Sequence, residues 1–386
     1  MRFAGLSRLK RGLAQLRDEH LVRQRRVRDG AQGAHVILDG RPVVSFCSND
    51  YLGLAADPAL TAAAHAALDQ CGVGAGAAHL ITGHHRCHDD FEAAFARFVG
   101  KPAALLFSAG YLANLGVLTA LAGRQGEIFA DKLNHASLID AAQLSGARCH
   151  RYRHLDLAQL EGQLAASTAA DKLIVSDLVF SMDGDVAPVD ALLDLAERYD
   201  AWLYLDDAHG FGVLNGGRGG LTERARASDR VIYLATLGKA AGVSGAAVAA
   251  HADVVDWLVQ KARAYVYTTA SPPLLAACLT ESLRQIEAGE ARRARLANHV
   301  AQLRAGLAEL NAGALLPSDT PIQPLIVGAS DDALRLSQAL LERGLLVPAI
   351  RPPTVPANTA RLRITLSAAH SEADVAHLVE ALHDLV

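Results

Sequence analysis

The sequence predicts an α/β fold with a large, mostly parallel sheet, helices on the faces of this sheet, and a smaller α+β domain at the C-terminal end. From about residue 100, short apolar runs alternate with longer segments of helical character, as in repeated strand–helix units. The apolar runs end in polar residues, at the edge where open α/β sheets bind ligands. With 386 residues, 51% of them hydrophobic, the chain can bury a large core.

The first predicted segment, residues 1–45, begins with an amphipathic helix. Leucines recur there at helical spacing, at Leu6, Leu9, Leu13 and Leu16. Acidic residues accompany the arginines, which disfavours a transit peptide, and the pattern of a secretory signal peptide is missing. The arginines between Arg23 and Arg28 are expected on a solvated face, from which one could reach an anionic substrate.

The second predicted segment, residues 46–285, contains the strand–helix units of the large domain. Five apolar runs with polar ends are predicted as its strands and strand ends, within 103–110, 127–137, 172–185, 201–210 and 230–239. A helix-rich tract at about 274–312 leads into the third segment, residues 286–386. This segment contains "IQPLIVGAS", "RGLLVPAIRPPTVP" and "ARLRITLSAAH", which predict the small α+β domain.

Composition excludes several classes of protein. The net charge of −4 offers no general attraction to nucleic acid or to anionic lipid. No apolar stretch reaches the 18 or so residues of a membrane helix. The five cysteines are odd in number and never form CxxC, as is typical of reduced thiols. We therefore expect a cytoplasmic enzyme that binds neither nucleic acid nor membrane.

Lys239 stands in an unusual place for a lysine. It follows the apolar run "RVIYLA", and the stretch "ATLGKAAGVSGAAV" around it consists mainly of small residues without charge. Desolvation in such surroundings favours the neutral amine. A neutral amine can form a Schiff base with a carbonyl cofactor.

Other polar residues at the predicted strand ends complete a candidate pyridoxal phosphate site. Asp206 could keep a pyridine nitrogen protonated, which makes the ring an electron sink. His135 could stack on the ring, and the glycine of "SAGYLAN" leaves backbone N–H groups free for a phosphate at a helix end. Each residue alone could be structural. Together the candidates are Gly110, Tyr111, His135, Ser181, Asp206, His209, Thr236 and Lys239.

Two motifs resemble ligand-binding patterns, one for a dinucleotide and one for zinc, but neither is predicted to bind that ligand. The GxGxG within 71–79 follows a helical segment rather than a strand, so we interpret it as a flexible loop near the site and not as a dinucleotide fingerprint. The stretch "GHHRCHDD" at 83–90 is rich in histidine, but no second pair of zinc ligands is evident at a suitable spacing. We interpret it as a helix start and predict no metal.

In this order, the motifs resemble those of the α-oxoamine synthases, pyridoxal-phosphate enzymes of the type I (aspartate aminotransferase) fold. The shared stretches are "SNDYLGL", "LNHASLIDA", "VFSMDGD", "DDAHGFGVLN" and "TLGK" with "SGA". The resemblance covers nearly the whole chain. It implies a homodimer with active sites at the subunit interface. Two alanines, Ala240 and Ala241, follow the lysine where relatives often carry glycine or serine and then an aromatic residue.

The resemblance also implies roles for single residues. Lys239 would hold the cofactor and later remove the α-proton of the amino acid, Asp206 would pair with the ring nitrogen, and His135 would stack on the ring. Ser181 and His209 would contact the ring hydroxyl. The phosphate would be bound by Gly110, Tyr111 and Thr236, and by Thr268 or Thr269 from the neighbouring subunit. The substrates would contact Arg23, Asn49, Thr354 and Arg363, with Arg363 preferred over Arg361 for the amino-acid carboxylate.

The segment "AIRPPTVP" at 349–356 is most similar to the branch of this family that serves biotin biosynthesis. That branch condenses L-alanine with a pimeloyl thioester of CoA or acyl carrier protein and releases CO2. Two alternatives remain open. One is a relative that joins glycine to acetyl-CoA, since methyl-sized discrimination is worth only about 1–3 kcal/mol. The other is a non-catalytic family subunit, although Lys239 and its predicted partners are all present.

Overall fold

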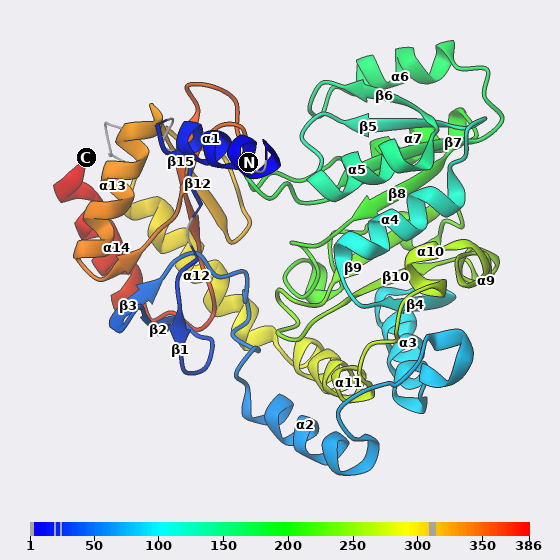
Figure 1. The fold of residues 1–386 in the computed structure, drawn as a ribbon, viewed down its shortest axis with the longest axis horizontal. Helices are drawn as coiled ribbons and strands as arrows, with labels where there is room; N and C mark the ends of the chain where they lie inside the picture. Colours follow the sequence, from blue (N-terminus) through cyan, green and yellow to red (C-terminus); the bar gives the residue numbers. More distant parts are fainter. Residues whose placement is uncertain (1–3, 19–20, 24, 309–313) are drawn as a thin grey trace.

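The computed structural model describes residues 4–18, 21–23, 25–308 and 314–386. A seven-stranded sheet lies at the centre of the larger part of the molecule (Figure 1). The strand order is β4-β10-β9-β8-β7-β5-β6, and only β10 runs against its neighbours. The strands are β4 (Ala103–Phe107), β5 (Glu127–Asp131), β6 (Arg148–Tyr152), β7 (Lys172–Asp177), β8 (Trp202–Asp206), β9 (Val231–Thr236) and β10 (Ala246–Ala250). The predicted α/β class with a mostly parallel sheet is confirmed.

Helices cover both faces of this sheet because successive residues of its strands point to opposite sides and most of them are apolar. One face packs Val175, Tyr204 and Leu234 into one core cluster, and the other face packs Ile174, Leu205 and Tyr233 into a second. The helices of this part are α3 (Arg86–Val99), α4 (Gly110–Leu121), α5 (Ala136–Ser145), α6 (Leu157–Ala166), α7 (Val189–Arg198), α8 (Glu223–Ala227), α9 (Ala252–Lys261) and α10 (Arg263–Val266), with the 3₁₀ turn η2 (Asn215–Gly217).

Long helices connect the two parts of the molecule. Helix α11 (Pro273–Glu287) packs against α2 (Pro58–Cys71) and α3, and α12 (Glu290–Gly306) runs on toward the C-terminal part. The π-helical turn η1 (His79–Gly83) lies between α2 and α3. The helix-rich tract predicted at about 274–312 is therefore observed, and its last residues, 309–312, lie outside the described part of the chain.

The C-terminal part contains an antiparallel sheet in the order β11-β12-β15-β14 with α13 and α14 beside it. Its elements are β11 (Ala314–Leu315), β12 (Ile322–Gly328), α13 (Ser330–Glu342), β13 (Leu345–Leu346), β14 (Ala349–Ile350), β15 (Ala360–Thr365) and α14 (Glu372–Leu385). Strand β13 instead joins a third sheet, because it pairs in parallel with a strand of the N-terminal segment. Both ends of the chain lie in this part of the molecule (Figure 1).

The N-terminal segment contains the expected helix, α1 (Ala4–Asp18), followed by three short strands. These are β1 (Arg28–Asp29), β2 (His35–Leu38) and β3 (Arg41–Ser45), which form a sheet with β13. The leucine stripe of α1 is exposed, with Leu9 at 58%. The N-terminal strands thus pair with β13 of the C-terminal part. The predicted domain boundaries at 45 and 285 remain predictions. Among the described residues, no helix is long and apolar enough to cross a membrane.

Candidate active site

A cavity of about 360 Å³ opens at the carboxyl ends of the central strands. Ten residues predicted for the site line it: Asn49, Gly110, Tyr111, His135, Ser181, Asp206, His209, Thr236, Lys239 and Arg363. Most of them follow the parallel strands, whose C-terminal ends meet at one edge of the sheet, whereas Asn49 follows β3 and Arg363 lies on β15. The structure therefore gathers these ten residues around one cavity.

Lys239 follows strand β9 and is half-buried. Its Nζ donates a hydrogen bond of 3.3 Å to Thr236 Oγ1. Burial lowers the pKa of Lys239, against the opposing influence of the carboxylates of Asp206 and Asp177. The amine is thus easier to deprotonate than that of an ordinary lysine, as covalent chemistry at Nζ requires.

Asp206 ends strand β8 and is buried. Its Oδ2 accepts a hydrogen bond of 2.8 Å from Asn114 Nδ2, and its Oδ1 accepts one of 3.0 Å from the Ala208 N–H. Asn114 is in turn fixed by Tyr204, whose hydroxyl donates to Asn114 Oδ1 at 2.6 Å. The carboxylate therefore has a fixed orientation at the cavity wall.

Asp177 lies beside Asp206 at the end of β7 and was missed by the sequence reasoning. Burial, and next the nearby Asp206 carboxylate, raise the pKa of Asp177 well above its usual value. Its Oδ2 accepts a hydrogen bond of 2.6 Å from the His135 N–H. Asp177 thus positions the residue that is predicted to stack on a cofactor ring.

His135 and His209 both line the cavity. His135 caps helix α5, where its Nδ1 accepts the Ser137 N–H at 3.2 Å, and burial lowers its pKa. His209 Nδ1 lies 2.5 Å from the Tyr51 hydroxyl. Burial, followed by the positive charges of Lys239 and Arg363, lowers the pKa of His209 well below its usual value. Both rings can therefore pack or accept hydrogen bonds without adding charge.

Arg363 has a buried guanidinium without a carboxylate partner among the described residues. Its Nε donates to Ser181 O at 2.5 Å, Nη1 donates to Thr365 Oγ1 at 2.9 Å, and both terminal nitrogens lie 3.3–3.4 Å from Asn49 Oδ1. Arg361, two residues earlier, is instead paired with Asp183 at 2.5 Å. Of these two arginines, only Arg363 lines the cavity, where it could bind an added carboxylate.

Helix α4 begins at the cavity and lacks a side-chain cap at its N-terminus. Gly110 is its first residue, and a Cβ added there would lie 2.5 Å from Thr236 Cγ2. Glycine is thus needed for this close approach. Free N–H groups at a helix N-terminus form a phosphate site. With the half-buried Lys239 and the buried Asp206 carboxylate, this cradle fits pyridoxal phosphate.

Four predicted residues do not line this cavity: Arg23, Thr268, Thr269 and Thr354. Arg23 and Thr354 are exposed, while Thr269 bridges Ala78. The predicted roles of these residues remain predictions. The GxGxG stretch is the irregular connection after α2, and it does not line the cavity either.

Seven lining residues were not predicted: Asn114, Ser137, Asp177, Met182, Ala208, Pro348 and Ile350. Asp177 carries the same signal as Asp206, a carboxylate at the end of an apolar run. Asn114 is a polar residue inside the otherwise apolar helix "GYLANLGVLTAL". The criterion that selected the other residues, a polar side chain beside an apolar run, therefore also applies to Asp177 and Asn114.

Comparison with known proteins places nearly the whole chain in one family. The family model for class I and II aminotransferases matches residues 41–382. An 8-amino-7-oxononanoate synthase from Thiobacillus denitrificans is 77% identical over 380 residues, which cover 98% of each chain.

Solved structures show the same fold. A serine palmitoyltransferase from S. paucimobilis with a bound PLP adduct has a TM-score of 0.92 at 26% identity, covering 100% of this chain and 98% of that one. The 8-amino-7-oxononanoate synthase from Francisella tularensis has a TM-score of 0.78 at 30% identity, covering 89% and 97%.

Proposed function

The chain belongs to the class I and II aminotransferase family, and from this premise we propose that it is a pyridoxal-phosphate-dependent 8-amino-7-oxononanoate synthase of biotin biosynthesis. The observation that carries the chemistry is the arrangement around one cavity of the Lys239 amine, the Asp206 carboxylate and the Arg363 guanidinium, which has no carboxylate partner in the described part of the chain. The high identity to a synthase of this name supports the branch. The enzyme joins L-alanine to a pimeloyl thioester and releases CO2, the product and the thiol carrier.

Each group at the cavity has a proposed task. Bound pyridoxal phosphate supplies the electron sink that stabilises a carbanion at the amino-acid Cα. Lys239 would hold the cofactor covalently until the amino acid displaces it, and the freed Nζ would then take the α-proton. Asp206 would pair with the ring nitrogen and His135 would stack on the ring. Ser181 and His209 would hold the ring hydroxyl, and Gly110, Tyr111 and Thr236 would hold the phosphate.

The substrates are proposed to bind on the other side of the cavity. Arg363, fixed by Asn49 and Thr365, takes the carboxylate of L-alanine. Arg23 and Thr354 are proposed contacts of the acyl chain. Thr268 and Thr269 are proposed to serve the phosphate site of a second copy, because neither lines the cavity of its own chain. The active form would then be a homodimer, and the free cysteines are consistent with the cytoplasm.

Thiol release tests this function. L-Alanine and glycine are each combined with pimeloyl-, acetyl- and succinyl-CoA, and free thiol is measured with the purified holoenzyme. We expect release with alanine and pimeloyl-CoA, and its loss in Lys239→Ala. Release with glycine and acetyl-CoA instead would place the protein in the glycine-using branch. If no CoA ester gives thiol release, pimeloyl-acyl carrier protein is tested next. The absence of thiol release with this donor too would refute the proposal.

The lysine assignment has a matched control. Lys261 is an exposed lysine stacked over Trp257 at 5.3 Å on helix α9, so Lys261→Ala should retain activity. Borohydride treatment should attach the cofactor covalently to the native protein and to Lys261→Ala. Attachment in Lys239→Ala, or turnover by it at the native rate, would contradict the role of Lys239.

A further inference from the structure

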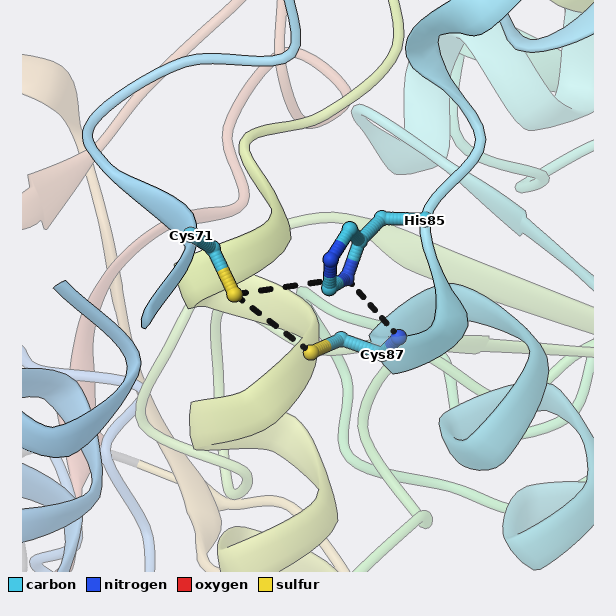
Figure 2. Close-up of side chains that lie close together, drawn as sticks. All are labelled: Cys71, His85 and Cys87. Atoms are coloured by element: carbon cyan, nitrogen blue, oxygen red, sulfur yellow. Dashed lines mark hydrogen bonds between the residues drawn. The ribbon is translucent and has the colours of Figure 1, made fainter. Parts of the chain in front are cut away.

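A second group of reactive side chains lies where helix α2 ends and helix α3 begins. Cys71 is the last residue of α2, His85 is the N-cap of α3, and Cys87 lies in its first turn. Figure 2 shows the three side chains converging on one point. None of them lines the Lys239 cavity. The sequence alone did not suggest this cluster, because Cys71 precedes the histidine-rich stretch and belongs to another helix.

The distances between the three side chains match a thiolate–imidazole metal site. The Sγ atoms of Cys71 and Cys87 are 3.9 Å apart, and Cys71 Sγ lies 4.0 Å from His85 Nδ1. One ligand atom from each residue lies within 4.8 Å of those of the other two. On tetrahedral zinc, with Zn–S of about 2.3 Å and Zn–N of about 2.0–2.1 Å, such atoms are about 3.5–3.8 Å apart. Small side-chain rotations would therefore bring all three onto one ion, and coordination through His85 Nδ1 would replace the hydrogen bond of 3.2 Å that this atom accepts from the Cys87 N–H.

The neighbouring histidines already have partners for most of their nitrogens. His88 Nδ1 accepts the His85 N–H at 2.9 Å, and His88 Nε2 lies 2.8 Å from Ser271 O. His84 lies between His79 and Asp89, at 2.8 Å from each. These rings fix the start of α3. The thiols, by contrast, make polar side-chain contacts only within the cluster, as far as the described residues extend.

The surroundings of the cluster allow an ion to enter. His85 is exposed, and the two cysteines are half-buried. Three protein ligands would leave the fourth tetrahedral position to water. Two thiolates with one imidazole select a borderline-soft ion, and among the common divalent ions this is Zn²⁺. A divalent cation would also offset the cost of ionising two adjacent thiols.

Disulfide formation is less well supported than metal binding. A disulfide would need the sulfur atoms at about 2.0 Å, roughly half their present separation. Metal binding needs only the small adjustment described above.

We propose that Cys71, His85 and Cys87 form a Zn²⁺ site, with water as the fourth ligand, which joins the end of α2 to the start of α3. The ion would bridge the two ends of the connection formed by residues 72–84. Within this connection Ala78 bridges Thr269, and Ala77 O accepts the Ala270 N–H at 2.9 Å. The site would thereby hold the connection against the segment that carries Thr268 and Thr269.

Cobalt titration tests the site, since Co²⁺ bound to thiolates in a tetrahedral site has visible ligand-field bands. The probe is Co²⁺ added to metal-stripped holoenzyme under a non-chelating reductant, followed by displacement with Zn²⁺. We expect one Co²⁺ per chain with these bands, and their loss when Zn²⁺ is added. Cys71→Ser and Cys87→Ser should each weaken binding at least as much as the roughly 10–100-fold that loss of an outer-shell partner costs.

Two further variants separate ligand loss from damage to the fold. His85→Asn removes the imidazole but keeps a side chain that caps helices well, so affinity should fall while the circular dichroism spectrum is unchanged. Cys149→Ser removes an exposed thiol outside the cluster and should bind Co²⁺ like the native protein.

Three results would overturn the proposal. One is the absence of tetrahedral bands at saturating Co²⁺. Another is binding that survives in Cys71→Ser but is lost in His84→Gln, which would move the ion to the neighbouring histidines. The last is a loss of two reactive thiols that a reductant, but not a chelator, restores, which would identify a Cys71–Cys87 disulfide instead.

Discussion

Asp177 and Asp206 are register partners at the carboxyl ends of the parallel strands β7 and β8, so two buried acids lie side by side at the cavity. Two like charges this close cannot both ionise without cost. The backbone and Asn114 donate hydrogen bonds to Asp206, whereas the pKa of Asp177 is raised well above its usual value by burial and by Asp206. Asp177 is therefore the member of the pair whose protonated form burial favours.

Replacing Asp177 with asparagine should stabilise the cofactor-free protein. A folded-state pKa above the unfolded value means that stability falls as pH rises from about 4 toward the folded pKa. Asparagine cannot ionise, yet its Oδ1 can still accept the His135 N–H. We expect the melting temperature of Asp177→Asn to exceed that of the native protein by about 2 °C at pH 8. The difference should vanish near pH 4.

A matched variant separates the charge from the hydrogen bond. Asp177→Ala removes both, so it should lose the acceptor for the His135 N–H and gain no net stability. If Asp177→Asn were as unstable as Asp177→Ala at pH 8, Asp177 would be ionised in the folded protein. The assignment of the proton would then be wrong.

Arg363 and Arg361 should respond differently to the same substitution. Arg363→Ala removes the cavity guanidinium that has no carboxylate partner among the described residues, so KM for L-alanine should rise about 10–100-fold, as expected for a lost hydrogen bond to a charged group. Arg361→Ala breaks the ion pair with Asp183 instead. It should lower the free energy of unfolding by roughly 1–3 kcal/mol and change KM by less than about threefold.

Steady-state kinetics and urea unfolding of the two variants check this contrast. An equal rise in KM in both would mean that the loop bearing Met182 and Asp183 shapes the alanine site. An unchanged KM in Arg363→Ala would remove Arg363 from substrate binding altogether.

The contrast between these arginines shows where sequence reasoning reached its limit. Arg361 and Arg363 are two residues apart on strand β15, so strand alternation places both on one face of the sheet. What separates them is Asp183, which lies 178 residues away in sequence and pairs with only one of them. The preference for Arg363 could therefore come only from family resemblance, and its physical reason required the structure.

Two strands of the large sheet escaped prediction for opposite reasons. Strand β6, "RCHRY", lies at the edge of the sheet and is largely exposed, so it shows no apolar run. Strand β10, "AAVAA", is fully buried, but its alanines have low strand propensity. The five predicted strands were those whose residues are both buried and rich in branched or aromatic side chains. Their polar ends were enough to locate most of the cavity.

His370 should make the protein less stable in mild acid. Burial lowers the pKa of this ring to about 4, against the weaker opposing effect of Asp374 and with a small contribution from His299. Nδ1 accepts the Ser367 N–H at 3.0 Å, and Nε2 lies 3.1 Å from Ser45 O, so the neutral ring is required. The unfolded chain binds a proton below pH 6.5, and stability is lost as pH falls from there toward 4.

The loss due to His370 should reach roughly 3 kcal/mol at pH 4, and urea unfolding at several pH values measures it. His370→Gln keeps one donor and one acceptor but cannot ionise in this range. Its stability should therefore depend less on pH than that of the native protein. Identical pH dependence in the two proteins would assign the acid sensitivity to another group, such as His79, whose pKa is also lowered to about 4.

At the proposed phosphate cradle Gly110 leaves no room for a Cβ beside Thr236, and a double variant can test this. A Cβ on residue 110 would approach Thr236 Cγ2 to 2.5 Å, so Gly110→Ala must displace the start of α4 or the threonine. We expect affinity for pyridoxal phosphate to fall about tenfold, equivalent to about 1.4 kcal/mol, in a fluorescence titration of cofactor-free protein.

Thr236→Ser alone removes the methyl group, keeps the hydroxyl and should bind pyridoxal phosphate nearly normally. In the double variant the clash disappears, so affinity should recover. A loss in the double variant equal to that in Gly110→Ala would mean that the closeness of residue 110 to the Thr236 methyl group does not explain the lower affinity.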